Sequence, residues 1–248
     1  MTPCEWDNAS WKELLEHCSK AQEYLLNSIL DLKYEVERNR NHSLIRSLSA
    51  RLKTMDSLTS KLKRMNLEPS VVNAATILHD IAGIRIICSY LDDINTVISQ
   101  LEHIPHYEIL EVKDYVHNPK PSGYRSVHVI GLCDISGRPV RCEIQLRTTA
   151  MDSWAALEHQ MRYKKDLPDC DFVNHELFEC ARMLYETDCR MQVIHGYLHN
   201  QALDLANGAS PKCSDKYIPE KRDCNDQPYP WNDDQPDTAV YPAKDREA

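Results

Sequence analysis

One stretch of nine residues, Val140–Thr148, constrains the fold of this chain more than any other. Polar and apolar side chains alternate along it, with Arg141, Glu143, Gln145 and Arg147 in one set and Cys142, Ile144 and Leu146 in the other. Successive side chains of a β-strand point to opposite faces, so the alternation predicts a strand whose polar face carries a carboxylate between two guanidinium groups. Taken alone, the strand is more typical of an ordinary sheet with one solvated face.

A second stretch, just before this strand, favours a binding site. Lys120 and Arg125 flank a Pro-x-Ser-Gly turn, in which glycine lets the backbone come close to a ligand. Tyr124, Ser126 and His128 then alternate onto one face. A phosphorylated nucleotide needs a ring to stack against its base and cations to hold its phosphates, and this stretch offers both. The alternative is a β-turn with a partly buried tyrosine.

The composition sets limits on the class of protein. A chain of 248 residues can build one substantial core, and no apolar run approaches the roughly 20 residues needed to cross a bilayer. The N-terminus lacks the basic and apolar regions of a signal peptide. The ten cysteines form no C-x-x-C pair, and Cys88, Cys133 and Cys142 occupy apolar strand positions. We therefore expect a cytoplasmic protein without a zinc site or a disulfide framework.

The charge is unevenly distributed. The net charge of −9 argues against general coating of nucleic acid. Between Arg38 and Arg64, however, eight Lys and Arg stand against a single acid, Asp56, which gives a local charge of +7. An acidic chain that concentrates its cations in one segment favours a compact anion such as a polyphosphate as their partner. A solvated helix face is the alternative.

Five motifs follow one another in the central part of the chain. They are Asp80-Ile-Ala-Gly-Ile-Arg85, Lys113-Asp-Tyr115, Pro119-Lys-Pro-Ser-Gly-Tyr-Arg-Ser126, Glu143-Ile-Gln-Leu-Arg-Thr148 and Trp154-Ala-x-x-Glu-His159. Together, over about residues 45–165, they resemble the synthetase domain of RelA/SpoT-type alarmone synthetases. The resemblance implies a Mg²⁺-dependent transfer of pyrophosphate from ATP to the 3′-hydroxyl of GDP or GTP. One departure is Ser122, where long family members usually carry Asn.

The same resemblance implies a role for each site residue. At the ATP it places Arg51 against adenine, Lys53 and Lys61 at the phosphates, and Arg85 as a further cation. Asp80 would hold Mg²⁺, and Glu143 would be the base for the 3′-hydroxyl or a second metal ligand. Tyr124 would stack on guanine, with Lys113, Lys120 and Arg125 near the 5′-phosphates and with His128, Gln145 and Arg147 in support. Asp152 and His159, seven positions apart on one helical face, line the cleft or form helix surface.

Periodicity divides the chain into four parts. Residues 1–43 form an N-terminal helical segment, since Ser10-Trp-Lys-Glu13 has the spacing of a capping box and an apolar helical repeat follows. Residues 44–165 form the synthetase core, residues 166–206 a C-terminal helix opened by Asp171, and residues 207–248 a disordered tail rich in Pro, Asp, Lys and Asn.

Within the core, strands and helices alternate. We expect strands at 107–115, 126–135 and 140–148, a strand that starts near Asp80, and helices that begin at Asp92 or Asp93 and near Ala150. Residues 44–65 carry a helical apolar stripe, although the region of Arg51 could be extended, and residues 66–78 read as a mobile connection. The expected class is therefore α/β (α+β), a mixed sheet with helices on one face and the polar face open as a cleft. The resemblance to RelA/SpoT-type synthetases implies that this fold is nucleotidyltransferase-like.

Three alternatives bear on the function. The His79-Asp80 pair could indicate a metal-dependent phosphohydrolase, but that domain would need a helical bundle and further histidines for which the chain leaves no room. A toxic small synthetase would use the same ATP half to modify the 3′ end of tRNA. A non-catalytic nucleotide-sensing protein would keep the fold but lose Asp80 or Glu143, and both are present. The two terminal helices predict a homo-oligomer, and small relatives often form tetramers.

Overall fold

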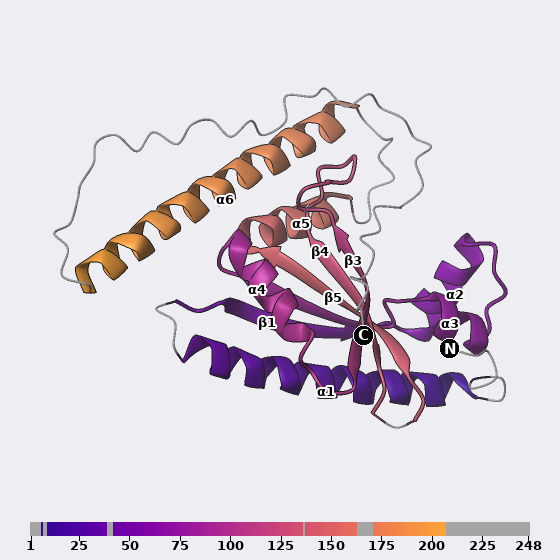
Figure 1. Cartoon of the computed structure of the whole chain (residues 1–248). Coiled ribbons are helices and arrows are strands. Elements are labelled where there is room, and N and C mark those ends of the chain that lie inside the picture. Colours follow the sequence, from indigo (N-terminus) through magenta and orange to yellow (C-terminus); the bar gives the residue numbers. More distant parts are fainter. Residues whose placement is uncertain (1–5, 7–8, 39–41, 136, 163–170, 207–248) are drawn as a thin grey trace, which may run out of the picture.

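A five-stranded mixed sheet forms the centre of the molecule (Figure 1). The computed structural model describes residues 6, 9–38, 42–135, 137–162 and 171–206, so the tail expected at 207–248 lies outside the described residues. In spatial order the strands are β1 (Ile45–Leu52), β2 (Ala82–Cys88), β5 (Val140–Thr148), β4 (Val127–Cys133) and β3 (Tyr107–Asp114). Strands β2 and β5 are parallel, and the other neighbours are antiparallel.

The described part of the chain contains six helices. They are α1 (Trp11–Glu37), α2 (Met55–Arg64), α3 (Val71–Ile77), α4 (Leu91–Leu101), α5 (Thr149–Arg162) and α6 (Asp171–Ala206). Figure 1 shows α1 running along the sheet, with α2 and α3 near one end and α4, α5 and α6 near the other. None of the helices in the described ranges is long and apolar enough to cross a membrane.

The apolar face of the sheet packs against α1 and α4. Helix α1 begins at the expected capping box, in which Glu13 N–H donates to the Ser10 hydroxyl and Ser10 N–H donates to the Glu13 carboxylate. Its buried stripe is Leu14, Cys18, Ala21, Leu25 and Ile29, and α4 contributes Ile94, Val97 and Leu101. These side chains join Ile84, Ile86, Ile144 and Leu146 of the sheet in one core. The expected sheet with helices on one face is thereby confirmed.

Pairing within the sheet brings the polar side chains to the other face. Glu143 lies beside Gly83 of β2 and Ile130 of β4, and Gln145 lies beside Arg85 and His128. Residues paired across neighbouring strands point to the same side of a sheet. The polar face is therefore built around β5, whose apolar residues Cys142, Ile144 and Leu146 are fully buried on the opposite side.

Two segments differ from the sequence-based expectation. The apolar repeat in residues 44–65 is not one helix, because Ile45–Leu52 is strand β1 and only Met55–Arg64 is helical. An isolated segment cannot reveal that β2 offers it a partner, with Arg51 opposite Gly83. The connection expected at 66–78 contains helix α3, capped by the Ser70 hydroxyl and buried through Ala74 and Ala75.

The remaining boundaries agree closely with the prediction. Strand β5 has the predicted ends, and β3 and β4 are shorter than predicted by one to three residues. Helix α5 begins at Thr149, one residue before the expected start, and α6 begins at Asp171 as expected. Helix α4 is capped differently, since its N-cap is Tyr90 and Asp93 instead accepts a hydrogen bond from the Tyr90 N–H.

Candidate active site

Glu143 lies at the centre of the polar sheet face. Its carboxylate accepts a hydrogen bond of 2.6 Å from Gln145 and lies 3.6 Å from Nδ1 of His128. Burial raises the pKa of Glu143, and the charge of Asp80 also raises it, but the His128 and Gln145 contacts outweigh both and hold the pKa below its usual value. Glu143 is thus an ionised carboxylate at neutral pH, as a metal ligand or general base must be.

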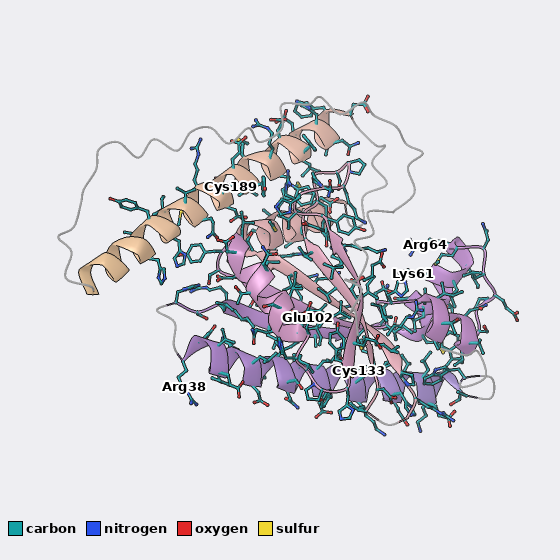
Figure 2. The ribbon with its side chains drawn as sticks, in the orientation of Figure 1. Arg38, Lys61, Arg64, Glu102, Cys133 and Cys189 are labelled. Atoms are coloured by element: carbon teal, nitrogen blue, oxygen red, sulfur yellow. The ribbon has the colours of Figure 1, made fainter. Side chains whose placement is uncertain are left out.

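Asp80, just before β2, holds two lysines from different elements. Lys53, directly after β1, donates to Asp80 Oδ2, and Lys61 of α2 reaches both carboxylate oxygens at 2.9 Å. Figure 2 labels Lys61 and Arg64 on α2 at this end of the sheet. Burial raises the pKa of Asp80, but the two ammonium groups hold it below its usual value. The lysines predicted for the ATP phosphates therefore converge on the predicted metal ligand.

The donor set suits Mg²⁺ more than a transition metal. The charge of Asp80 acts on Glu143, so the two carboxylates share one environment. Within the described ranges, no group of three His, Cys, Asp or Glu could hold a metal ion by itself. Mg²⁺ commonly takes one or two carboxylates and completes its octahedron with water and substrate phosphates. Asp80 and Glu143 fit that pattern, with the nucleotide supplying the missing oxygens.

Tyr124 belongs to a chain of polar contacts that ends at Glu143. Its hydroxyl lies 2.8 Å from Nε2 of His128 and accepts a 2.7 Å hydrogen bond from Nη2 of Arg147. His128 then faces Glu143 through its other ring nitrogen. With a proton on Nδ1, His128 points a donor at the carboxylate and accepts from the tyrosine, so one tautomer satisfies the whole chain. The tyrosine is thereby fixed beside the polar sheet face.

Arg147 connects the polar side chains around Tyr124. It is only 4% exposed, and it donates to Asp152 at 3.0 Å, to the Tyr124 hydroxyl and to the Gln145 side-chain oxygen at 3.3 Å. Asp152 also lies 3.4 Å from Arg85 on β2. The cleft interpretation of Asp152 is thus favoured by its contacts, whereas His159 is exposed on α5.

The other predicted cations surround the same face. Lys113 on β3 is paired with His128 in the sheet and lies 3.7 Å from Glu111. Lys120 lies over the Tyr115 ring at 4.7 Å and over the Tyr124 ring at 6.0 Å. Lys120 thus lies beside Tyr124, as expected for a cation near the phosphates of a stacked nucleotide, whereas Lys113 lies beside His128.

Arg51 and Arg85 belong to β1 and β2, which lie across β5 from β4, although Arg85 also interacts with Asp152. Both project from the β1–β2 pair, and Arg51 is exposed on its strand. Burial lowers the pKa of Arg85, and the nearby positive charges of Arg147 and Arg51 lower it further. The positive charges therefore lie close to one another on this part of the polar sheet face. Binding of a polyanion or an electron-rich ring would be favourable there.

Two predicted residues of the tyrosine loop are directed elsewhere. Arg125 stacks its guanidinium on the ring of Tyr185 in α6, 4.0 Å from the ring centroid, and donates to the Val116 carbonyl. Ser126 is fully buried and donates to the Leu146 carbonyl at 3.1 Å, so it does not share the face of Tyr124 and His128. The expected alternation breaks here because Ser126 precedes β4 and is bonded to the neighbouring strand.

One polar pair at the edge of the site was not anticipated from the sequence. Arg141 donates to Nδ1 of His79 at 3.0 Å, and burial followed by the Arg141 charge lowers the pKa of His79. A neutral His79 beside Asp80 therefore holds the start of β5 against the start of β2. The sequence signal was present, because His79 precedes a motif residue and Arg141 belongs to the alternating strand, but only the parallel pairing of β2 and β5 brings the two together.

Comparisons with known proteins agree with this geometry. Residues 50–167 match the family described as "Region found in RelA / SpoT proteins". The GTP pyrophosphokinase YwaC of Bacillus subtilis is 38% identical over 168 residues, which cover 66% of this chain and 79% of that protein. Small alarmone synthetase 1 from Bacillus subtilis, bound to its product pppGpp, has a TM-score of 0.68 at 31% identity and covers 75% of this chain and 96% of that chain. A second structure of that synthetase, bound to AMPCPP, has a TM-score of 0.63 at 28% identity, with coverages of 77% and 98%.

Proposed function

The chain belongs to the RelA/SpoT family of GTP pyrophosphokinases, and from this premise we propose that it transfers pyrophosphate from ATP to the 3′-hydroxyl of GDP or GTP, giving (p)ppGpp and AMP. The observation that carries the proposal is the arrangement around Glu143. Lys53 and Lys61, both paired with Asp80, lie on one side, and the fixed ring of Tyr124 lies on the other. Two nucleotides can thus meet at one carboxylate.

We assign ATP to the side of β1, β2 and α2. Arg51 and Arg85 would face the adenine, and Lys53 and Lys61 would bind the phosphates, because compact ammonium groups suit phosphate and planar guanidinium groups suit ring stacking. On binding, the lysines would leave Asp80 for the nucleotide. The structure of a similar synthetase bound to AMPCPP supports an adenine nucleotide as one of the two ligands.

We assign the acceptor to the side of β3, β4 and β5. Tyr124 would stack on guanine, Lys113 and Lys120 would face the 5′-phosphates, and His128, Gln145 and Arg147 would hold the tyrosine and the carboxylate in place. Base stacking on an aromatic ring contributes about 1–3 kcal/mol. The structure of a similar synthetase bound to its product pppGpp supports a guanine nucleotide as the acceptor.

The reaction joins the two halves at the β-phosphorus of ATP. The 3′-oxygen of the acceptor attacks that phosphorus, the bond between the β-phosphorus and the α,β-bridging oxygen breaks, and AMP leaves with the electron pair. Glu143, ionised and buried beside His128, accepts the hydroxyl proton or holds the metal. Mg²⁺ held by Asp80 and Glu143 would neutralise the charge that develops on the transferred group. Lys53 and Lys61 would share that task.

A labelling assay tests the proposal directly. The purified full chain is incubated with Mg²⁺ and ATP labelled in its β-phosphate, together with GDP, GTP or deacylated tRNA. We expect label in a guanosine 3′-pyrophosphate and release of AMP. Label in tRNA instead would identify the tRNA-modifying alternative. If no AMP is formed with any of the three acceptors, the non-catalytic alternative would be favoured. Omission of Mg²⁺ is the control for the metal.

The place of action and the assembly complete the proposal. Both substrates are cytoplasmic nucleotides, so we place the enzyme in the cytoplasm. The homo-oligomer expected from the terminal helices stays a prediction, which light scattering on the full chain would decide.

A further inference from the structure

Helix α6 lies directly against the loop that presents Tyr124. We name residues Pro119–Ser126 the acceptor loop. Within it, Gly123 N–H donates to the Lys120 carbonyl at 2.8 Å, and Lys120 N–H donates to the Tyr124 carbonyl at 3.1 Å, so the loop closes on itself. The side of the loop that faces α6 is shielded from solvent. Gly123 is buried and Arg125 is half-buried there, against residues that lie beyond the last synthetase motif in the sequence.

Gly123 makes the closest approach to α6. Its φ is +88°, and a Cβ at this position would lie 2.8 Å from the Ala181 Cβ and 3.1 Å from the Phe178 Cα. Any side chain would therefore push the loop away from the helix, in addition to the strain of the left-handed backbone. Only glycine allows the loop to rest on α6 at this distance.

Arg125 makes the second contact between the loop and α6. Its guanidinium lies 4.0 Å from the ring centroid of Tyr185, within the range of a cation–π contact, and it also donates to the Val116 carbonyl. A planar guanidinium can stack and donate at the same time, which an ammonium group cannot do equally well. Arg125 thus connects α6 to the segment that enters the acceptor loop.

These contacts hold the backbone on both sides of the tyrosine. Gly123 and Arg125 are the two neighbours of Tyr124, and both face α6. Between them, the Tyr124 ring packs against the cluster of Trp154, Ala155, Leu177 and Ala181, and its hydroxyl contacts His128 and Arg147. Fixing the two neighbours therefore fixes the backbone from which the Tyr124 ring reaches His128 and Arg147.

Helix α6 is itself fixed to the core at several points. Trp154 of α5 donates its indole N–H to the Leu177 carbonyl at 2.8 Å, and the buried Thr148 hydroxyl donates to Asp188 at 2.5 Å. Further along, Gln192 exchanges two hydrogen bonds with Asp92, of 3.1 and 2.6 Å. A helix bonded to α4, α5 and the end of β5 can act as a rigid support for a loop.

We propose that Tyr185 of α6 is a positioning residue for the acceptor nucleotide: by holding Arg125, it fixes the acceptor loop so that Tyr124 faces the cleft. Tyr185 packs against the main core and reaches the acceptor loop through its contact with Arg125. The inference rests on the proposed function, since it assigns the acceptor to Tyr124. It also gives Arg125 a structural role in place of direct contact with the 5′-phosphates.

The test compares acceptor binding with ATP binding in Tyr185→Ala. Affinities for GDP and for a non-hydrolysable ATP analogue are measured separately on the full chain by titration calorimetry, and KM is measured for both substrates. We expect the Kd for GDP to rise about threefold to tenfold, the range that a partly buried cation–π contact supports. The Kd for the ATP analogue and kcat at saturating GDP should stay unchanged.

Three further variants make the test specific. Tyr185→Phe keeps the ring and should bind GDP like the wild type. Leu198→Ala removes an exposed side chain of the same helix, 60% accessible, and should change nothing. Adding Tyr185→Ala to Arg125→Ala should weaken GDP binding no further than Arg125→Ala alone, because the two residues act as one unit.

Several outcomes would overturn the inference. If Tyr185→Ala binds GDP as tightly as the wild type, Tyr185 has no positioning role. The proposed function would still hold in that case, provided that the wild type transfers label to GDP or GTP. Equal losses of GDP and ATP binding, with a lower melting temperature, would reduce Tyr185 to a stabilising residue. Full additivity with Arg125→Ala would show that it does not act through Arg125. A wild type that binds no GDP would sink this inference and the proposed function together.

Discussion

The proposed ATP half and the proposed acceptor half of the site hold their charged groups in different ways. In the ATP half, Lys53 and Lys61 come from the end of β1 and from α2, and both are paired with Asp80 through long side chains. In the acceptor half, Arg147 projects from the central strand, is almost fully buried, and makes hydrogen bonds to three different side chains. Two cations share one carboxylate in the first case, whereas one guanidinium is held by three acceptors in the second.

On the proposed function, the lysines of the ATP half must change partners when ATP binds, whereas the side chains around Tyr124 already have the arrangement that the acceptor needs. When ATP and its metal bind, the two lysines have to exchange Asp80 for phosphate oxygens, so part of the binding energy replaces an existing contact. Tyr124 and His128 need no such exchange. Their polar contacts are made to Arg147, Glu143 and each other, which leaves the tyrosine ring available to the guanine. Preorganised groups lose less conformational freedom on binding, which favours affinity and orientation of the acceptor.

The largest expected effect lies where the halves meet. Glu143→Gln should keep the hydrogen-bonding shape but remove the negative charge, so that turnover falls by about 10²–10⁴-fold, the usual contribution of general-base catalysis. Binding of both nucleotides in the absence of Mg²⁺ should persist, as measured by calorimetry. Rates close to those of the wild type would remove Glu143 from the chemistry and from the comparison.

Loss of the tyrosine ring should affect one half only. Tyr124→Ala should raise KM for GDP or GTP about tenfold to a hundredfold, in line with roughly 1–3 kcal/mol of base stacking. KM for ATP should not change. Tyr124→Phe keeps the ring but loses the contacts to Arg147 and His128, so its KM should lie between those of Tyr124→Ala and the wild type. A rise in KM for ATP would show that the cleft is divided differently.

Loss of one lysine should affect the other half, and by less. Lys61→Met should raise KM for ATP about tenfold, since a hydrogen bond to a charged group contributes about 1.5–3 kcal/mol and Lys53 remains. The matched control is Lys63→Met, which removes an exposed lysine from the same helix. The rise should shrink at high salt, where exposed charges are screened. A change in acceptor KM alone would contradict the assignment of α2 to ATP.

The smallest expected effect concerns the helix that supports the acceptor half. Burial raises the pKa of Asp188, against the opposing effect of its Thr148 hydrogen bond. The folded chain therefore holds this proton more tightly than the unfolded chain, and the contribution to stability falls as pH rises through the folded-state pKa. Asp188→Asn, which cannot become charged, should melt at a higher temperature at pH 7, and the gain should shrink toward pH 4.

The size of that shift and its control are modest. About 1 kcal/mol corresponds to roughly 2–4 °C in a chain of this size, and the shift should not exceed that range. Asp31→Asn, at an exposed position of α1, is the control and should melt like the wild type at every pH. An equal gain at all pH values would assign the effect to packing instead of charge.

Much of the fold was predictable because its signals are local. The capping box of α1, the alternation in Val140–Thr148 and the start of α6 at Asp171 each depend on residues close in sequence, and each agrees with the structure. The segment around Arg51 was only partly predictable, because its sequence left both a helix and an extended piece open, and the extended alternative is the correct one. Its apolar spacing fits a helix, and only the hydrogen bonds offered by β2 make it a strand.

The candidate site shows the same limit. The motifs named Asp80, Glu143, Tyr124 and Arg147, and the sheet brings them to one face. The motif could not tell that Arg125, one position after Tyr124, turns to Tyr185, or that Ser126 is bonded to the Leu146 carbonyl. Neighbours in a tight loop face opposite sides, and which side is the cleft depends on elements far away in sequence.

The amino-acid order by itself determined which chemical groups are available: two carboxylates, a cluster of cations and a tyrosine in a glycine turn, set in strands with one apolar face. Tertiary structure alone decided which of them meet. The parallel pairing of β2 with β5 joins Asp80 to Glu143, and the return of α6 onto the acceptor loop gives Arg125 its partner. The reason is physical, since side-chain periodicity is a local property of the backbone, whereas burial and electrostatic coupling depend on contacts between segments distant along the chain.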